Sequence, residues 1–370
     1  MKRQSFILGS AAAVAGLPLL ERLAARADAT QSLKAAAASK GIVFGSNVRD
    51  VDLLTGDPAF AALTANQCAA VEAGHSFQWA QLRPNPNSFN FDKADALVSW
   101  AQSHGLKTCE CHLMWHHSFP KWLPGQLNSS NWRDLLSNHI RTVVGRYAGK
   151  MYYWVAVNEA IQIKDGRPDG LRNKLWTAVG GQDAIDLAFR TAGEADPKAQ
   201  LVYNDYGLEQ DDPNNVEKRK IVLKMVEGMK SRGVPIHAVG LESHMNGAQE
   251  FQGSGLGQFI DDLGSMGVKV FITELDSGDE GLPSDSTARD TTMANLYGKF
   301  LATVLPHKNV TTIVMWSLAD KYFWRNGWTT NGKSGRSDGL PQRGMPFGTD
   351  LEPTPIYNAI LQAFQAAPTR

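Results

Sequence analysis

The chain is poor in cysteine and has no net charge. Only three of its 370 residues are cysteines, Cys68, Cys109 and Cys111. They form no C-x-x-C pair and no metal-ligand spacing with histidine, so we predict no metal site, and the spacing assigns no disulfide. Lys+Arg and Asp+Glu both number 37. This balance argues against a polyanion such as nucleic acid bound on a broad basic face.

No Gly-, Ser- or Pro-rich linker divides the chain. Its composition, 43% hydrophobic and 20% charged, is ordinary for a globular protein. We therefore predict one domain over residues 30–370 that acts as a monomer. No cofactor is expected.

The first 29 residues have the features of a bacterial export signal. Lys2 and Arg3 precede a short apolar run, Phe6–Leu20, and small-x-small cleavage candidates lie between Ala25 and Ala29. The run is too short for a stable membrane span. A disordered tail would fit the apolar run poorly. We expect a secreted or periplasmic protein with no membrane attachment after processing, and the basic pair hints at the twin-arginine route.

Beyond residue 40, eight short apolar runs alternate with longer amphipathic segments. Each run has the length of a buried parallel strand. The runs are Gly41–Val48, Cys68–Gly74, Leu106–Trp115, Met151–Glu159, Leu201–Tyr206, Val239–Met245, Lys269–Asp276 and Thr312–Ala319. Predicted helices include Asp92–Ser103, Trp132–Tyr147, Asp183–Ala192 and Val216–Arg232, with Gly105 and Gly233 as C-terminal stops.

This alternation predicts the α/β class and a (β/α)8 TIM barrel. A doubly wound open sheet is the alternative, but no G-x-G-x-x-G follows the first strand. The glycine-rich stretch 326–344 is predicted as a loop on the active face.

Polar residues gather where the predicted strands end. In a barrel these ends meet at one mouth, where active sites of this fold are built. The residues are His112, Trp115, His116, Asn158, Glu159, Asn204, Asp205, Glu242, His244, Glu274, Asp276, Trp316 and Asp320. A buried core gives no reason for so many strands to end in polar groups.

Glu159 and Glu274 are the candidate catalytic pair. Glycoside hydrolysis uses two carboxyl groups, one to protonate the leaving oxygen and one to attack the anomeric carbon. Metal-assisted hydrolysis would also use strand-end carboxylates, but His112 and His116 have no matching ligand motif. Tryptophans near strand ends suit stacking on apolar sugar faces.

These motifs resemble glycoside hydrolase family 10, the retaining endo-β-1,4-xylanase family. The likeness covers nearly the whole mature chain. Two of the matching motifs carry the carboxylates, Trp154-Val-Ala-Val-Asn-Glu-Ala160 and Phe271-Ile-Thr-Glu-Leu-Asp276. The others are Leu113-Met-Trp-His116, Tyr203-Asn-Asp-Tyr206, Ser243-His244, Trp316-Ser-Leu-Ala-Asp320, Pro346-Phe347, Asp350 and Pro353-Thr-Pro-Ile-Tyr357.

The resemblance implies a role for each matching residue. Glu159 would be the acid/base and Glu274 the nucleophile, while Asn158 would bind the sugar 2-hydroxyl. His244 would bridge toward Glu274, with Asp276 fixing its tautomer. Expected substrate contacts are Trp115, His116, Asn158, Tyr206, Glu242, His244, Trp316 and Trp324, supported by Asp276 and Cys111. The implied substrate is a β-linked plant polysaccharide, xylan, or its oligosaccharides.

Several residues depart from the family pattern. Cys111 stands where the family has His, Glu242 where it has Gln, and Val155 where it has Asp. The second-strand motif, Glu72-Ala-Gly-His-Ser-Phe-Gln-Trp79, lacks the family's Asn and Lys in place. Each lost hydrogen bond to a charged group would remove roughly 1.5–3 kcal/mol of glycone binding.

Two consequences follow from these departures. Glu242 near Glu159 should push one pKa upward, so that one of the two stays protonated near neutrality. A retaining β-glycosidase of the same family, acting on a decorated or non-xylan glycoside, is the alternative function. An inactive carbohydrate-binding barrel is a weaker alternative, because both glutamates are present.

Overall fold

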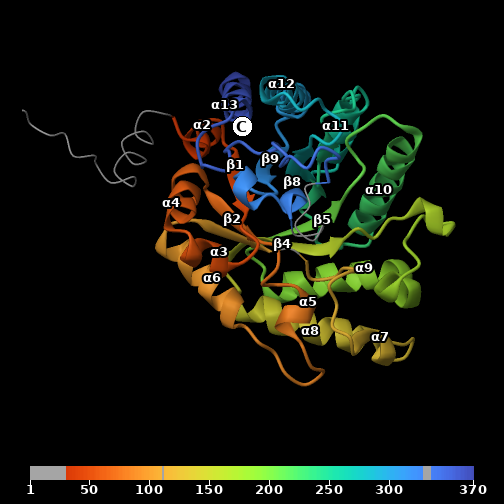
Figure 1. Cartoon of the computed structure of the whole chain (residues 1–370). Coiled ribbons are helices and arrows are strands. Elements are labelled where there is room, and N and C mark those ends of the chain that lie inside the picture. The colour runs from red at the N-terminus through yellow and green to blue at the C-terminus, as the bar shows by residue number, and fades with distance from the viewer. Residues whose placement is uncertain (1–30, 111, 328–334) are drawn as a thin grey trace, which may run out of the picture.

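Eight parallel strands close into a barrel, as predicted (Figure 1). The computed structural model describes residues 31–110, 112–327 and 335–370; the predicted export signal, Cys111 and part of the loop predicted at 326–344 lie outside them. The barrel strands are β1 (Val43–Asn47), β2 (Ala70–Ala73), β3 (Lys107–Glu110), β4 (Met151–Asn158), β5 (Gln200–Asp205), β6 (Ala238–Leu241), β8 (Lys269–Gly278) and β9 (Val310–Met315). Pairing of β6 with β8 and of β1 with β9 completes the circle, and the short β7 (His244–Asn246) pairs with β8 beyond the end of β6.

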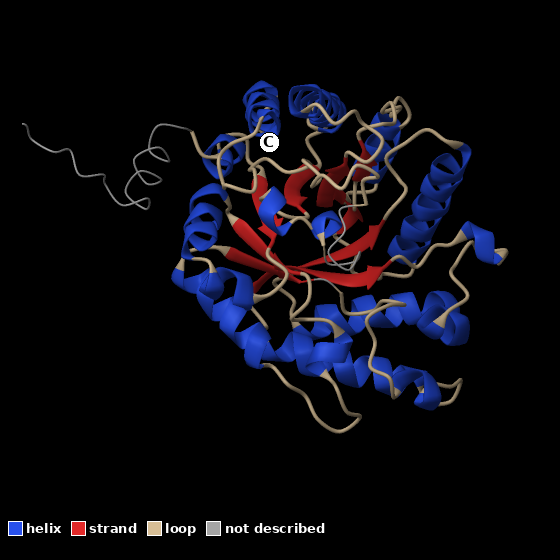
Figure 2. Ribbon diagram, viewed as in Figure 1, coloured by secondary structure: helices blue, strands red, loops and turns tan. Residues whose placement is uncertain are grey.

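Helices surround the barrel on its outer face (Figure 2). They are α2 (Leu33–Ala38), α3 (Val51–Gly56), α4 (Pro58–Gln67), α5 (Trp79–Leu82), α6 (Asp92–Ser103), α7 (Leu123–Gln126), α8 (Trp132–Arg146), α9 (Leu175–Ala195), α10 (Pro213–Ser231), α11 (Leu256–Ser265), α12 (Ser286–Val304) and α13 (Pro355–Ala366), with 3-10 turns η1 (Ile163–Asp165), η2 (Asp320–Tyr322) and η3 (Trp324–Asn326). Within the described ranges, none of the helices combines the length and hydropathy needed to cross a bilayer.

Local sequence signals set the helix ends. Asp212 accepts hydrogen bonds from the first backbone amides of α10, and Pro213 follows in the first turn, where its missing N–H costs nothing. Gly105 and Gly233 have φ of 67° and 65° just after α6 and α10, which confirms them as stops. The helix predicted at Asp183–Ala192 is part of the longer α9, which has a non-helical residue at Gly181.

Three strands end at least four residues earlier than predicted. β3 ends at Glu110, the residue paired with Ala73 at the end of β2. Residues 112–116 therefore lie on a loop. The predicted strand Val239–Met245 divides into β6 and β7 at Ser243, whose φ of 63° breaks the ladder. β9 ends at Met315 rather than Ala319.

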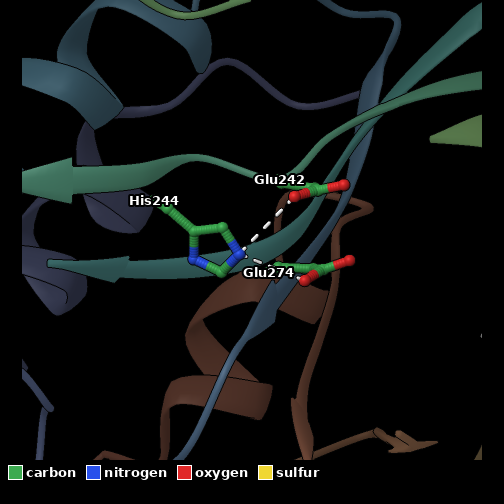
Figure 3. Close-up of side chains that lie close together, drawn as sticks. All are labelled: Glu242, His244 and Glu274. Carbon is green, nitrogen blue, oxygen red and sulfur yellow. Dashed lines mark hydrogen bonds and ion pairs between the residues drawn. The ribbon is translucent and has the colours of Figure 1, made fainter. Parts of the chain in front are cut away.

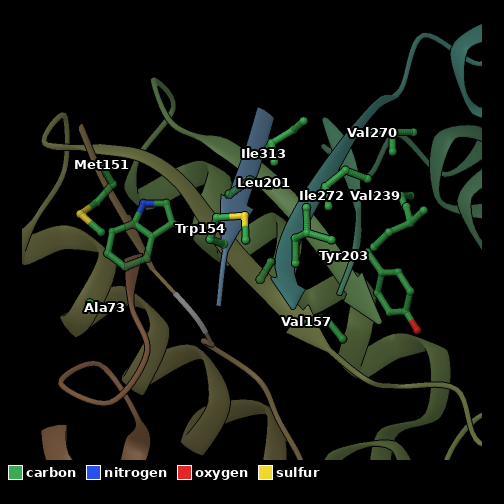
Figure 4. Packing of buried hydrophobic residues seen from close by; sticks show 14 of the residues in the cluster. Ala73, Met151, Trp154, Val157, Leu201, Tyr203, Val239, Val270, Ile272 and Ile313 are labelled. Carbon is green, nitrogen blue, oxygen red and sulfur yellow. The ribbon is translucent and has the colours of Figure 1, made fainter. Parts of the chain in front are cut away.

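Alternate strand residues build two separate apolar clusters. One lies inside the barrel, where Tyr153 of β4 and Phe271 of β8 have ring centroids 5.4 Å apart although these strands are not neighbours. The other packs between the strands and the helices and includes Trp154, Leu201 and Ile272 (Figure 4). Filling both faces of each strand fixes the strand ends, and with them the side chains at the mouth.

Candidate active site

A cavity of about 610 Å³ opens at the carboxyl ends of the strands. Its walls include nine of the predicted site residues, Trp115, Asn158, Glu159, Tyr206, Glu242, His244, Glu274, Trp316 and Trp324. They come from six different strand ends or the loops that follow. The barrel thus brings together residues up to about 200 positions apart, as expected for this fold.

Glu159 lies one residue beyond β4, in a left-handed backbone conformation with φ of 52°. This conformation is unfavourable for a residue with a side chain. A hydrogen bond from the Glu159 amide to the Asn204 carbonyl, 2.9 Å long, helps to hold it. The turn places the carboxylate in the cavity wall.

A chain of amide hydrogen bonds joins the two candidate catalytic carboxylates. Asn158 Nδ2 donates to Glu159 Oε1 (3.1 Å), and Asn204 Nδ2 donates to Asn158 Oδ1 (2.9 Å). Asn204 Nδ2 also donates to Glu274 Oε1 (2.9 Å). Thr273 Oγ1 donates to Asn204 Oδ1 and so orients the amide. Asn204 therefore fixes Glu159 and Glu274 relative to each other, and we call it the hub of this hydrogen-bond network.

Two imidazoles keep Glu274 ionised. Burial alone would raise the pKa of Glu274, but His112 and His244 outweigh it and lower the pKa to about 2. His244 Nε2 lies 3.2 Å from Glu274 Oε2, and His112 Nε2 lies 3.8 Å from Oε1. A carboxylate in this environment is unprotonated at neutral pH and suited to act as a nucleophile.

The pKa of Glu159 is shifted in the opposite direction to that of Glu274. Burial and the negative charges of Asp205 and Glu274 raise its pKa to about 7, although Arg172 and Lys218 act against the rise. Arg172 Nη2 lies 3.8 Å from Glu159 Oε2. A carboxyl group with this pKa can hold and release a proton near neutrality, as an acid/base catalyst must.

His244 is held between two carboxylates, as the sequence predicted. Its Nδ1 lies 3.0 Å from Asp276 Oδ1, and its Nε2 faces Glu274. Burial alone would lower the pKa of His244, but Asp276 and Glu274 raise it well above its usual range. Asp276 is fully buried, and Trp324 Nε1 donates to its other oxygen. These contacts fix the ring with Nε2 toward the cavity.

Glu242 lies beside this network. Its Oε2 is 3.6 Å from His244 Nε2 (Figure 3), and its Oε1 accepts from Asn204 Nδ2 at 3.3 Å. Burial and the charges of Glu274 and Glu159 raise the pKa of Glu242 well above its usual range. The sequence prediction that Glu242 or Glu159 carries a raised pKa is confirmed in direction for both.

Some strand-end residues have other positions. His116 is outside the large cavity, but its Nε2 lies 3.8 Å from Glu159 Oε2. Burial and nearby Arg172 lower the pKa of His116 to about 2, so the ring is neutral. Asp205 is buried and paired with Lys218 at 2.6 Å. Asp320 is buried and accepts from the backbone amides of Gly344 and Met345. Both aspartates were predicted at the mouth of the barrel, and neither lines the cavity.

An imidazole lies next to position 111, where the resemblance predicted the loss of one. Cys111 itself lies outside the described residues. The next residue, His112, supplies an imidazole to Glu274. Because β3 ends at Glu110, the side chain of His112 does not follow the alternation between the two faces that strand residues show.

A second cavity of about 340 Å³ adjoins the first and shares Gly74, Gln78 and three tryptophans with it. It also has Asn47, Arg49 and His75 in its walls. This region includes Gly74, His75 and Gln78 of the second-strand motif, residues 72–79, which departs from the family pattern. Asn47 and Arg49 were not among the predicted site residues, although a search for polar residues at the end of the first strand would have found them.

One set of side chains has the composition of a metal site. Within the described ranges, ligand atoms of Glu242, His244 and Glu274 all lie within 4.8 Å of one another. No metal site was predicted from the sequence, because the cysteines, His112 and His116 match no ligand spacing.

Comparisons with known proteins agree with this geometry. The family model for Glycosyl hydrolase family 10 matches residues 32–363. Endo-1,4-beta-xylanase 3 of Hypocrea jecorina is 31% identical over 339 residues, which is 91% of this chain and 87% of that protein. Beta-1,4-xylanase of Dictyoglomus thermophilum is 33% identical over 270 residues, 70% of this chain and 73% of that one. The crystal structure of xylanase XynB from Paenibacillus barcinonensis, complexed with a conduramine derivative, has a TM-score of 0.78 and 26% identity, and the match covers 90% of this chain and 98% of that one.

Proposed function

The chain belongs to glycosyl hydrolase family 10, and on this premise we propose that it is a retaining endo-β-1,4-xylanase. The observation that carries the proposal is that two carboxyl groups joined by hydrogen bonds have pKa values shifted in opposite directions. The pKa of Glu159 is raised to about 7 and that of Glu274 is lowered to about 2, while Asn158 and Asn204 connect them. Two carboxyl groups whose environments separate their pKa values in this way are the expected acid and nucleophile of a glycosidase.

In the first step, ionised Glu274 attacks the anomeric carbon while Glu159 gives its proton to the departing glycosidic oxygen. The bond to the leaving sugar breaks, and an α-linked glycosyl-enzyme forms on Glu274. The amide of Asn158 is placed to hydrogen-bond the sugar 2-hydroxyl. Such a contact strengthens as the oxocarbenium-like transition state develops.

In the second step, Glu159 has become a carboxylate and acts as a base. It takes a proton from water, whose oxygen attacks the same anomeric carbon and releases Glu274. Two inversions give a product with the original β configuration. His244, which contacts Glu274, stabilises the negative charge that returns to this carboxylate.

Xylan and xylo-oligosaccharides are the substrates we favour. Relatives that share about a third of their residues with this chain are named β-1,4-xylanases. Trp115, Trp316 and Trp324 give the cavity aromatic walls on which a sugar ring can lie. These observations support xylan over a decorated or non-xylan β-glycoside.

We place this activity outside the cytoplasm, in a secreted or periplasmic monomer without a membrane anchor. The support is the basic start and the short apolar run of residues 1–29. Expression of the full chain with fractionation, followed by N-terminal sequencing of the exported form, tests this point. Retention of an uncut protein in the cytoplasm would contradict it.

The activity is tested by hydrolysis of xylan, xylohexaose and aryl β-glycosides of xylobiose, glucose and cellobiose. We expect short xylo-oligosaccharides from xylohexaose, and NMR should show the β anomer first. A mechanism-based fluoroglycoside should label the peptide that contains Glu274. An initial α anomer would exclude retention, and turnover of glucosides without xylan cleavage would exclude the substrate.

A further inference from the structure

His244 Nε2 points toward two carboxylates at once (Figure 3). It lies 3.2 Å from Glu274 Oε2 and 3.6 Å from Glu242 Oε2. Zinc binds imidazole nitrogen and carboxylate oxygen at about 2.0–2.2 Å, which separates neighbouring ligand atoms of a tetrahedral site by roughly 3.4 Å. Both distances from His244 are close to this spacing, and all three ligand atoms lie within 4.8 Å of one another. Movement of the carboxylates toward each other would place the three in one coordination sphere.

The histidine is supported as metal ligands usually are. A metal-binding imidazole commonly donates its other ring N–H to a carboxylate, which fixes the ring and strengthens the ligand. Here His244 Nδ1 lies 3.0 Å from fully buried Asp276, which Trp324 holds in turn. Nε2 is therefore directed toward Glu242 and Glu274 before any cation arrives.

A second observation points to the same place. His112 is 5% exposed, and neither of its ring nitrogens makes a hydrogen bond within the described part of the chain. Its Nε2 lies 3.8 Å from Glu274 Oε1, on the same carboxylate that faces His244. Apart from this ion-pair contact the buried imidazole has no hydrogen bond among the described residues, which is costly. It offers a further nitrogen donor beside the other three ligands.

We propose that Glu242, His244 and Glu274 bind a zinc-like divalent cation that competes with the sugar for the reaction centre. The mixed nitrogen and oxygen donors suit zinc or copper, whereas Mg²⁺ and Ca²⁺ favour oxygen ligands alone. The cation would take the place of the proton between His244 and Glu274 and cover the nucleophile. Glu242 is decisive, because the neutral amide of a glutamine there would be a much poorer ligand.

Calorimetric titration of the full chain with Zn²⁺ and with Mg²⁺ tests the site without using activity. We expect one Zn²⁺ per chain and no comparable Mg²⁺ binding. Glu242→Gln and Glu274→Gln, both nearly isosteric, should each weaken Zn²⁺ binding by at least about tenfold. His307→Asn is the matched control. It removes an imidazole that contacts only one carboxylate among the described residues, Asp261 at 2.6 Å, and should leave Zn²⁺ binding unchanged.

The proposal is overturned if the unmodified chain takes up no Zn²⁺, if both glutamine variants bind it as tightly, or if His307→Asn weakens binding equally. A melting curve shows whether each variant is folded, and one folded glutamine variant is enough. Competition with the sugar is the part that rests on the proposed function. Xylotriose should weaken Zn²⁺ binding; Zn²⁺ binding in a chain that cleaves no xylan would refute the proposed function and keep the site.

Discussion

The reaction centre and the adjoining cavity of about 340 Å³, which we propose as the glycone pocket, use polar groups in different ways. In the centre, Asn158, Asn204 and His244 connect Glu159, Glu274 and Glu242 through contacts of 2.9–3.6 Å. In the glycone pocket, Asn47 Nδ2 and His75 Nδ1 make no hydrogen bond within the described residues, and the nearest carboxylate to His75, Asp50, is 3.6 Å away.

This difference separates two tasks. A connected network holds its groups in place before the substrate binds, which is what transition-state stabilisation requires. A side-chain nitrogen without a hydrogen bond in the described part of the chain, such as Asn47 Nδ2, can gain one from a bound sugar or from water. We therefore expect changes in the centre to lower kcat severely, and changes in the pocket to alter KM modestly.

The largest effect should come from Glu274→Ala, which removes the nucleophile from the centre. We expect kcat on an aryl β-xylobioside to fall by at least about 10⁴-fold, as for other essential nucleophiles. Glu217→Gln, on the exposed face of α10, changes an equivalent carboxylate and should leave kcat unaltered. Retention of even a hundredth of the activity by Glu274→Ala would contradict the proposed mechanism.

Glu159→Gln should have the next largest effect, by removing the proton donor. We expect kcat/KM on xylan to fall by about 10²–10⁴-fold, and by less on aryl glycosides whose leaving group needs no proton. Because Glu159 must be protonated to act and its pKa is about 7, wild-type kcat/KM should decline as pH rises through about 7. That alkaline decline should be absent from the pH profile of Glu159→Gln; an unchanged decline would assign it to another group.

Gly240→Ala tests whether Asn204 is the hub of the centre. A Cβ at Gly240 would lie 2.2 Å from Asn204 Oδ1 and 2.8 Å from Thr273 Cγ2, so the amide must move. We expect kcat to fall roughly 10- to 100-fold through lost hydrogen bonds to charged groups, and the free energy of unfolding to fall by about 1–3 kcal/mol.

The matched control is Gly145→Ala in α8, where nothing lies within 4 Å of an added Cβ. It should raise the free energy of unfolding by about 0.5–1 kcal/mol and leave kcat unchanged. Urea unfolding with steady-state kinetics on both variants makes the comparison. Full activity in folded Gly240→Ala would show that Asn204 does not organise the centre.

The sequence predicted the barrel because each strand is an apolar run with its own polar end. Those runs depend on local residue order, so the eight strands and the position of Glu159 at the end of β4 were accessible without a structure. Glu274, predicted at a strand end, lies within β8, which continues to Gly278. The contact of His244 with Glu274 and Asp276 was also predicted, but from the family resemblance rather than from spacing.

Contacts between distant segments were not accessible in the same way. Asn204 reaches Asn158, Glu242 and Glu274, which are 46, 38 and 70 residues away, so its role depends on the closed circle of strands. His112 follows the early end of β3 and contacts Glu274, which is 162 residues further along the chain. Such contacts follow from packing between distant segments, and no local sequence pattern predicts them.

The smallest effect should come from Gln78→Ala, on the boundary between the two regions. Gln78 lines both cavities, and its Nε2 donates to the Gly74 carbonyl at 2.9 Å. A neutral hydrogen bond contributes about 0.5–1.5 kcal/mol, so we expect KM for xylohexaose to rise roughly 2- to 10-fold with kcat nearly unchanged. A loss in kcat as large as that of Gly240→Ala would mean that the pocket belongs to the preorganised network, and that the proposed division between chemistry and sugar binding lies further from the nucleophile.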